Sequence, residues 1–327
     1  MWDKDFEDLC RIAKENDLDA RSFLQRRSEF EILFHHVSIP PGRSLEVGCG
    51  GGFLTALLAR EGKLAVGIDM AAPDDLTHSR GLAVPAALKA ALQAPNLHFL
   101  GSSGELLSFR AGSFDLVLSS YVLEHIENRA MAVREMKRVL RDDGLIVALV
   151  PAWMERVYAP VSYYHNLVWG SLRSAWRFLL RKLGPARGGT AHSDAGGNPG
   201  GISIAPGQRP EEGDEGIRAK LRKFFRVYHP TFPFPRPHGY YRSSSEELRA
   251  HRYRSWARLF EGEGLVIERA FATRIAPTTL LEIISDGADR TVQSAALGIV
   301  KRGGEGRWIR FLAYSLCFVL RKESGRP

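Results

Sequence analysis

The stretch SLEVGCGGGF, residues 44–53, decides the fold of this chain. Its first four residues are typical of a buried strand, and residues 53–59 have the apolar composition of a helix. Between them Gly48, Gly50 and Gly52 alternate. Glycine adopts positive φ and lets a ligand approach the backbone closely, and the start of a helix offers unpaired N–H donors. The stretch therefore predicts a strand–turn–helix unit that can bind a ligand at its turn.

A second apolar run, residues 64–68, predicts the neighbouring strand, and Asp69 stands at its carboxyl end. A carboxylate in that place can accept both hydroxyls of a ribose. The glycine spacing excludes the dinucleotide fingerprint Gly-x-Gly-x-x-Gly, because its third glycine would fall on Phe53 or on Thr55. A glycine turn without any ligand is the alternative.

Further strands follow in alternation with helices, at residues 97–100, 114–119 and 144–150. This alternation predicts a parallel sheet with helices on both faces, whose strand carboxyl ends meet along one edge. Residues 265–271 and 316–320 predict a sixth strand and a final antiparallel strand. The fold class that follows is α/β, with seven mostly parallel strands.

Three stretches resemble motifs of the class I S-adenosylmethionine (SAM) methyltransferases. The pattern Glu-x-Gly-x-Gly-x-Gly of residues 46–52 is similar to their first motif. SFDLVLSSYVLEHI, residues 113–126, is similar to the segment around their fourth strand, and RVLRDDGLIVALVP, residues 138–151, to the segment leading into their fifth. The group that these stretches most resemble is methyltransferase type 11, which includes small-molecule and quinone-biosynthesis enzymes.

The resemblance implies a Rossmann-like sheet and SAM as the cofactor. The expected cofactor-binding positions lie at successive strand ends and are Glu46, Gly48, Cys49, Gly50, Gly52, Asp69, Met70, Ser103, Gly104, Glu105, Ser119, Ser120 and Tyr121. One of them departs from the family. When the segments are aligned on Phe109, the family's aspartate falls on Ser103, which can accept a hydrogen bond from the adenine amino group but carries no charge.

Methyl transfer needs a protein base only when the acceptor is a neutral hydroxyl, amine or carbon acid. His125 in the fourth-strand motif and His238 in a proline-rich stretch are the candidate catalytic residues, with His165 and His229 as further candidates. The three cysteines of the chain have no metal-ligand spacing, so no metal site is expected.

Composition limits the partners and the compartment. The chain has 327 residues and a net charge of +8, which favours anionic partners such as acidic substrates, a membrane surface or nucleic acid. Nucleic-acid methyltransferases that modify amino groups carry Asn/Asp-Pro-Pro-Tyr/Phe after the fourth strand, where this chain has SSYV, residues 119–122. Nucleic acid is therefore the least favoured of the three partners.

Sparse cysteines and an N-terminus without the apolar core of a signal peptide predict a cytoplasmic protein. No apolar run reaches the ~18 residues of a membrane span. Peripheral contact with a membrane is the alternative that the positive net charge favours.

Four regions are expected along the chain. Residues 1–43 form a helical segment in which Arg26 and Arg27 are expected to be solvated, and residues 44–150 form the SAM-binding core. Residues 151–239 form an inserted cap that contains a disordered loop, 186–216, because glycine, proline and charged residues dominate that loop. Residues 240–327 complete the domain, and they begin with one helix from Ser243 to Gly262 or Gly264.

These observations favour a SAM-dependent methyltransferase that acts on a small-molecule or lipid-linked acceptor. Aromatic and basic residues of the cap region suit an apolar acceptor with an anionic group. Two alternatives are a protein of the same fold that binds SAM or a partner without turnover, and a nucleic-acid methyltransferase.

Overall fold

The computed structural model describes residues 2–60, 63–70, 73–74, 79–158, 237, 240–275, 297–302 and 305–323. The chain separates into two compact units, Met1–Ala159 with Arg236–Pro327, and Pro160–Pro235. The second unit lies entirely outside the described residues. So do His238 and the loop predicted at 186–216.

Seven strands form one sheet, as the sequence predicts. They are β1 (Arg43–Val47), β2 (Leu64–Asp69), β5 (Leu97–Gly101), β6 (Phe114–Ser120), β7 (Leu140–Pro151), β8 (Leu265–Ile275) and β9 (Ala313–Lys322). Their order is β5-β2-β1-β6-β7-β9-β8. All neighbours pair in parallel except β9, which is antiparallel to both β7 and β8. This is the predicted Rossmann-like, mostly parallel architecture.

The chain winds outward from β1 in both directions, so the strand order reverses between β1 and β6. Such a reversal leaves a crevice at the carboxyl ends of the strands, and ligands of open α/β sheets bind there. Val47 pairs with Ser119 at this point, which brings the glycine-rich turn after β1 beside the SSYV segment after β6. Two short strands, β3 (Pro73–Asp74) and β4 (Ser79–Arg80), pair separately from the main sheet.

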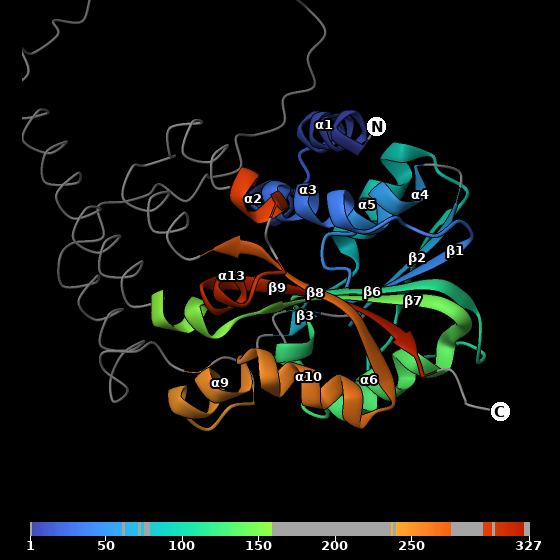
Figure 1. Cartoon of the computed structure of the whole chain (residues 1–327). Coiled ribbons are helices and arrows are strands. Elements are labelled where there is room, and N and C mark those ends of the chain that lie inside the picture. The colour runs from blue at the N-terminus through green and yellow to red at the C-terminus, as the bar shows by residue number, and fades with distance from the viewer. Residues whose placement is uncertain are drawn as a thin grey trace, which may run out of the picture. The chain divides into compact units, whose positions relative to one another are not determined.

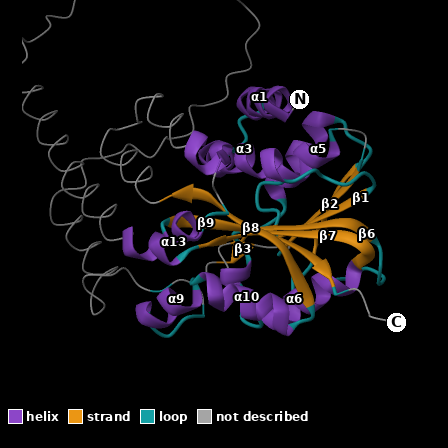
Figure 2. Ribbon diagram, in the orientation of Figure 1, coloured by secondary structure: helices purple, strands orange, loops and turns teal. Residues whose placement is uncertain are grey.

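Helices cover both faces of the sheet (Figures 1 and 2). Above it in Figure 1 lie α1 (Trp2–Glu15), α2 (Arg21–Gln25), α3 (Arg27–His36), α4 (Phe53–Ala59) and α5 (Ala83–Leu92). Below it lie α6 (Arg129–Val139), α9 (Ser244–Ala250) and α10 (Tyr253–Gly262). A short helix, α13 (Arg307–Phe311), immediately precedes β9.

The N-terminal helices pack on the glycine-turn helix through a row of rings. Phe6 of α1 stacks on Phe23 of α2 with centroids 4.3 Å apart, and Phe23 stacks on Phe53 of α4 at 5.3 Å. All three are buried. Because Phe53 follows the glycine turn directly, this row fixes the N-terminal segment against the side of the crevice.

The single helix predicted after Ser243 is wrong, because the segment forms two helices. Ser243 caps α9 as expected, since its hydroxyl accepts a hydrogen bond from the Glu246 amide at 3.2 Å. The break comes at His251 and Arg252. His251 is buried between the rings of Tyr241 and Trp256, and Arg252 has extended backbone. A buried histidine at a helix end depends on partners distant in sequence, which periodicity cannot detect.

None of the described helices is both long and apolar enough to cross a bilayer.

Candidate cofactor and active site

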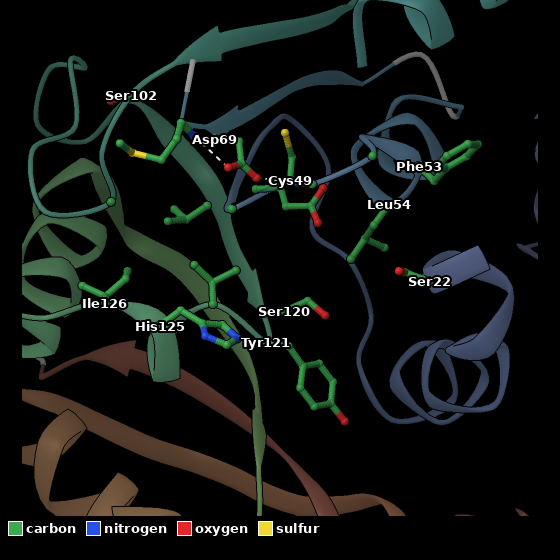
Figure 3. A pocket seen from close by; sticks show the side chains of 18 of the residues that line it. Ser22, Cys49, Phe53, Leu54, Asp69, Ser102, Ser120, Tyr121, His125 and Ile126 are labelled. Atoms are coloured by element: carbon green, nitrogen blue, oxygen red, sulfur yellow. Dashed lines mark hydrogen bonds between the residues drawn. The ribbon is translucent and has the colours of Figure 1, made fainter. Parts of the chain in front are cut away.

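A cavity of about 470 Å³ opens at the crevice between β1 and β6. It is bounded by the glycine-rich turn, the ends of β2 and β6, the loop after β5 and the N-terminal helices. In Figure 3 Asp69 and Cys49 stand at one end and Tyr121 at the other. His125 and Ile126 lie along one side, and Leu54 and Ser22 along the opposite side.

The glycine turn leaves its backbone open to a ligand at one residue in particular. Gly48, Gly50 and Gly52 all have positive φ, at 75°, 51° and 77°. A Cβ at Gly48 would lie 2.2 Å from a methyl carbon of Val122, and one at Gly52 would lie 2.6 Å from the Phe99 ring. A Cβ at Gly50 would meet no atom within 4 Å. Gly48 and Gly52 are therefore required by packing, while Gly50 faces the cavity.

Asp69 holds the turn in place. Its Oδ2 accepts a hydrogen bond from the Gly50 amide at 2.7 Å, and its Oδ1 accepts one from the Met70 amide at 2.7 Å. The carboxylate lies at the end of β2 and lines the cavity, as predicted for a ribose acceptor. Because it also orders the Gly50 amide, Asp69 couples the ligand position to the shape of the turn.

Glu46 is buried within β1 at the base of the cavity. The Thr55 hydroxyl of α4 donates a hydrogen bond to its carboxylate. Burial raises the pKa of Glu46 to about 8, against the opposing effect of that hydrogen bond. Cys49 beside it is also buried, and burial together with the charge of Glu46 raises the pKa of its thiol well above the usual range. Neither side chain presents a reactive anion to the cavity near neutral pH.

The loop after β5 supplies another wall. Ser103, Gly104 and Glu105 all line the cavity. The Ser103 hydroxyl accepts a hydrogen bond from the Glu105 amide at 3.2 Å, and the Glu105 carboxylate accepts one from the Asn128 amide at 2.7 Å. The position where the family has an aspartate is thus used here to shape the loop itself.

Tyr121 closes the other end of the cavity in a strained conformation. Its φ is 57°, in the left-handed region that residues other than glycine rarely adopt. Its hydroxyl donates a hydrogen bond to Oε1 of Glu29 at 3.1 Å. Glu29 is itself buried and lies 3.5 Å from the Arg274 guanidinium. Backbone strain of this kind persists only where surrounding contacts enforce it, and it concentrates at functional sites.

Arg26 lies in the cavity wall, so the prediction that it is solvated is wrong. Its guanidinium carbon lies 4.3 Å from the centre of the Tyr121 ring, and its Nη1 donates to the Ser120 hydroxyl at 3.2 Å. Among the described residues that line the cavity, it is the one lysine or arginine. Its neighbour Arg27 is exposed as expected and pairs with Glu7. The sequence gives no local signal that distinguishes the two arginines.

His125 also lines the cavity, on the 3-10 turn η1 (Leu123–His125) that follows β6. Its Nε2 lies 3.9 Å from Oε1 of Glu124. Glu124 is buried, and burial raises its pKa to about 8. A histidine beside a buried carboxyl group in a cavity can accept a proton from a ligand.

The structure brings together most of the residues expected from sequence. The expected residues that line the cavity are Glu46, Gly48, Cys49, Gly50, Asp69, Met70, Ser103, Gly104, Glu105, Ser120, Tyr121 and His125. Gly52 and Ser119 do not line it. Gly52 begins α4 against Phe99, and Ser119 is buried inside the sheet between Val47 and Ala148. His238 lies outside the described residues.

The groups that line the cavity suit the chemical parts of SAM. The open position at Gly50 admits a ligand against the backbone, and Asp69 can accept ribose hydroxyls. Arg26 at the opposite end suits the carboxylate of the methionine part, because guanidinium groups bind carboxylates well. Leu54 and Ile126 add apolar surface between these ends.

Comparison with known proteins agrees with this site. A family model described as a methyltransferase domain matches residues 45–148. The ubiquinone biosynthesis O-methyltransferase of Albidiferax ferrireducens is 33% identical over 151 residues, which cover 42% of this chain and 57% of that protein. An uncharacterized methyltransferase of Mycobacterium sp. (strain JLS) is 36% identical over 116 residues, which cover 35% of this chain and 41% of that protein. The chain thus spans about half the length of the curated relatives that it matches.

Among solved structures, the geranyl diphosphate C-methyltransferase of Streptomyces coelicolor A3(2) is similar with a TM-score of 0.47 and 11% identity. That comparison covers 92% of this chain and 80% of the other. The PH0226 protein of Pyrococcus horikoshii OT3 has a TM-score of 0.37 and 22% identity, over 42% of this chain and 63% of the other.

The segment that the family model matches contains both the glycine-rich turn and the strands that border the cavity. The match at residues 45–148 contains every strand end that borders the cavity from β1 to β6. Through this segment, about a third of the chain, the protein is similar to the methyltransferase domain family, and SAM is the cofactor that this similarity implies.

Proposed function

We propose that this chain transfers the methyl group of SAM to a hydroxyl oxygen of a small organic acceptor. The observation that carries the proposal is the presence of His125 in the same cavity as Gly50 and Asp69. A hydroxyl is a poor nucleophile while it keeps its proton, so its methylation benefits from a base. The names of the relatives in Albidiferax ferrireducens and Hahella chejuensis, both O-methyltransferases, support oxygen as the acceptor atom.

SAM, when bound, supplies a methyl group already activated by its sulfonium, so the protein's part is to position the reactants and to remove one proton. Asp69 and Arg26 would hold the two ends of the cofactor, and Gly50 would admit it against the turn. Holding two reactants in line can contribute on the order of 7–11 kcal/mol. Tyr121 would shape the end of the cavity nearest Arg26.

His125 would accept the hydroxyl proton at a ring nitrogen. Glu124, 3.9 Å from Nε2, would orient the imidazole and stabilise its protonated form once the carboxyl group is ionised. Because burial raises the pKa of Glu124 to about 8, that stabilisation grows as the pH rises through this value. Methyl transfer should therefore be faster on the alkaline side of neutrality.

The test compares His125→Asn with the unmodified chain. SAM affinity is measured by calorimetry, and release of S-adenosylhomocysteine is measured with catechol, an aliphatic alcohol, an amine and a carbon acid as acceptor probes. We expect catechol to be methylated, and His125→Asn to slow that reaction by about 10²- to 10⁴-fold while SAM affinity stays the same. The matched control is His35→Asn, which alters an exposed histidine outside the cavity.

Full activity in His125→Asn would exclude His125 as the base. If the amine or the carbon acid is methylated in preference to the hydroxyl probes, the acceptor atom is not a hydroxyl oxygen and the proposal is wrong. SAM binding without turnover of any probe would favour the non-catalytic alternative.

A further inference from the structure

A second hollow, about 840 Å³ in volume, lies apart from the cofactor cavity and shares none of its lining residues. The described residues that line it are of two kinds. Four are aromatic: Trp153, Tyr253, Trp308 and Phe311. Four are basic: Arg252, Arg254, Arg307 and Arg310. We call this the basic–aromatic surface.

Two side chains of this surface on α13, together with Leu312 directly after that helix, project outward. Trp308 is 79% exposed, Phe311 52% and Leu312 38%. Residues three and four apart lie on the same side of a helix, so these three side chains form one apolar face. Apolar residues exposed in a contiguous group on one helix face mark an interaction site, whereas single exposed ones do not.

The residues beneath this face contact one another and the sheet. The Trp153 indole donates a hydrogen bond to the Phe311 carbonyl at 3.0 Å, and the two rings lie 5.0 Å apart. Tyr253 stacks on Phe318 of β9 at 5.4 Å, and the Arg310 guanidinium lies 4.8 Å from the Tyr253 ring centre. These contacts link α13 to Trp153, which follows β7, and to Tyr253, which packs on β9.

The described part of the chain places no opposite charge beside this surface. Among the described residues, no acidic side chain lines the hollow and none of the four arginines forms an ion pair. Arg252, Arg254 and Arg307 are exposed. A partner that covers this surface must therefore be anionic.

The surface and the cofactor cavity share one edge of the sheet. Trp153 comes two residues after the end of β7, whose carboxyl end lies beside that of β6. β9 runs antiparallel to β7, so α13, which precedes β9, lies at the same edge (Figure 1). Whatever docks on α13 meets the side of the molecule on which the cofactor cavity opens.

We propose that the basic–aromatic surface docks the chain on an anionic phospholipid bilayer. Aromatic and aliphatic side chains flanked by arginines suit the boundary between headgroups and acyl chains. Single-stranded nucleic acid is favoured less, because Leu312 has no ring face on which a base can stack. The proposal concerns where the chain acts and does not require methyl transfer.

The test uses the full chain and co-sedimentation with vesicles of phosphatidylcholine alone or of phosphatidylcholine mixed with phosphatidylglycerol. We expect binding to the mixed vesicles only. Arg254→Gln with Arg307→Gln should weaken it about 30-fold, since each arginine near an anionic surface contributes about a fivefold increase in affinity. Trp308→Ala should weaken it about tenfold and Trp308→Phe much less, because phenylalanine keeps an apolar ring at the interface.

Controls place the same charge change at the opposite edge of the sheet. Arg60 follows α4 and Arg110 precedes β6, both are exposed, and Arg60→Gln with Arg110→Gln should bind mixed vesicles like the unmodified chain. Equal loss in the control pair would show that net charge alone is responsible and would overturn the proposal. So would equal binding to neutral vesicles, or binding of a single-stranded oligonucleotide but of no vesicle.

Discussion

The two ends of the cofactor cavity differ in how far along the chain their contacts reach. At the glycine end, Asp69 accepts from Gly50, nineteen residues away, within one strand–helix–strand unit. At the tyrosine end, Tyr121 donates to Glu29 over a separation of 92 residues, and Arg26 donates to Ser120 over 94. The first end is determined by backbone geometry, while the second is determined by side chains that meet only in the folded chain.

This difference predicts how each end responds to substitution. At the glycine end, the turn fixes both the φ of each glycine and the space available for a Cβ. The backbone there can therefore adjust little to a substitution. Side chains at the tyrosine end can move or exchange partners, so the loss of one contact should be partly offset by the others. Substitutions at the glycine end should therefore cost more than those at the tyrosine end.

Gly48→Ala should be the most damaging substitution at the glycine end. The new Cβ would lie 2.2 Å from Val122 at a φ of 75°, so strain and collision add. We expect the free energy of unfolding to fall by at least about 3 kcal/mol, measured by urea denaturation. Gly50→Ala also has positive φ but meets nothing within 4 Å, and should cost only about 1–2 kcal/mol.

A double variant separates the two causes at Gly48. Val122→Ala in the Gly48→Ala background removes the two closest colliding methyl groups and leaves the strained φ, together with the Val122 Cβ at 2.9 Å. We expect partial recovery of stability, with a remaining cost above that of Gly50→Ala. Equal stability of Gly48→Ala and Gly50→Ala would show that the turn adapts and would remove the contrast.

Asp69→Ala should weaken SAM binding. It removes the carboxylate that would accept the ribose hydroxyls of SAM. The same carboxylate accepts hydrogen bonds from the Gly50 and Met70 amides, and these are lost as well. We expect the affinity measured by calorimetry to fall by about 1.5–3 kcal/mol, the range for hydrogen bonds to charged groups. Asp115→Ala is a matched control, because Asp115 accepts from the Arg43 amide at the other edge of the sheet. Unchanged SAM affinity in Asp69→Ala would contradict the role of Asp69 in binding.

The same contrast explains what could be predicted from sequence. Apolar runs and the glycines between them predict all seven strands and the parallel core. They also predict the residues of the glycine end. Arg26 was indistinguishable from Arg27 in sequence, yet only Arg26 reaches Tyr121. Likewise the break at His251 depends on the rings of Tyr241 and Trp256. Local patterns determine local geometry, whereas the choice of distant partners depends on the tertiary fold.

Glu46 should give the stability of the chain a measurable pH dependence. Its pKa is raised from 4.5 to about 8, so between these values the folded chain keeps a proton that the unfolded chain has released. The free energy of unfolding therefore falls as pH rises across this interval, by up to about 1.4 kcal/mol per pH unit from this group. Glu46→Gln keeps an acceptor for the Thr55 hydroxyl and should make the slope shallower by that amount.

The measurement is urea denaturation at a series of pH values between about 5 and 8, where the two states differ in bound protons. Part of the slope should remain in Glu46→Gln, because burial raises the pKa of Glu124 to a similar value. The control is Glu261→Gln, which changes an exposed carboxyl group on α10. A slope that Glu46→Gln leaves intact would mean that Glu46 is ionised in the folded chain.

Tyr121→Phe should have the smallest effect of the four. It deletes the hydrogen bond to Glu29 but keeps the ring below Arg26, and Glu29 retains Arg274 within 3.5 Å. We expect a loss of about 1 kcal/mol in the free energy of unfolding. A double-mutant cycle with Glu29→Gln measures the coupling directly, because a shared contact makes the two losses non-additive. Tyr253→Phe is the control, since its hydroxyl has no hydrogen-bond partner in the described part of the chain. If Tyr121→Phe instead destabilises the chain as strongly as Gly48→Ala, long-range side-chain contacts hold the cavity as firmly as the glycine backbone does, and the contrast between its two ends is wrong.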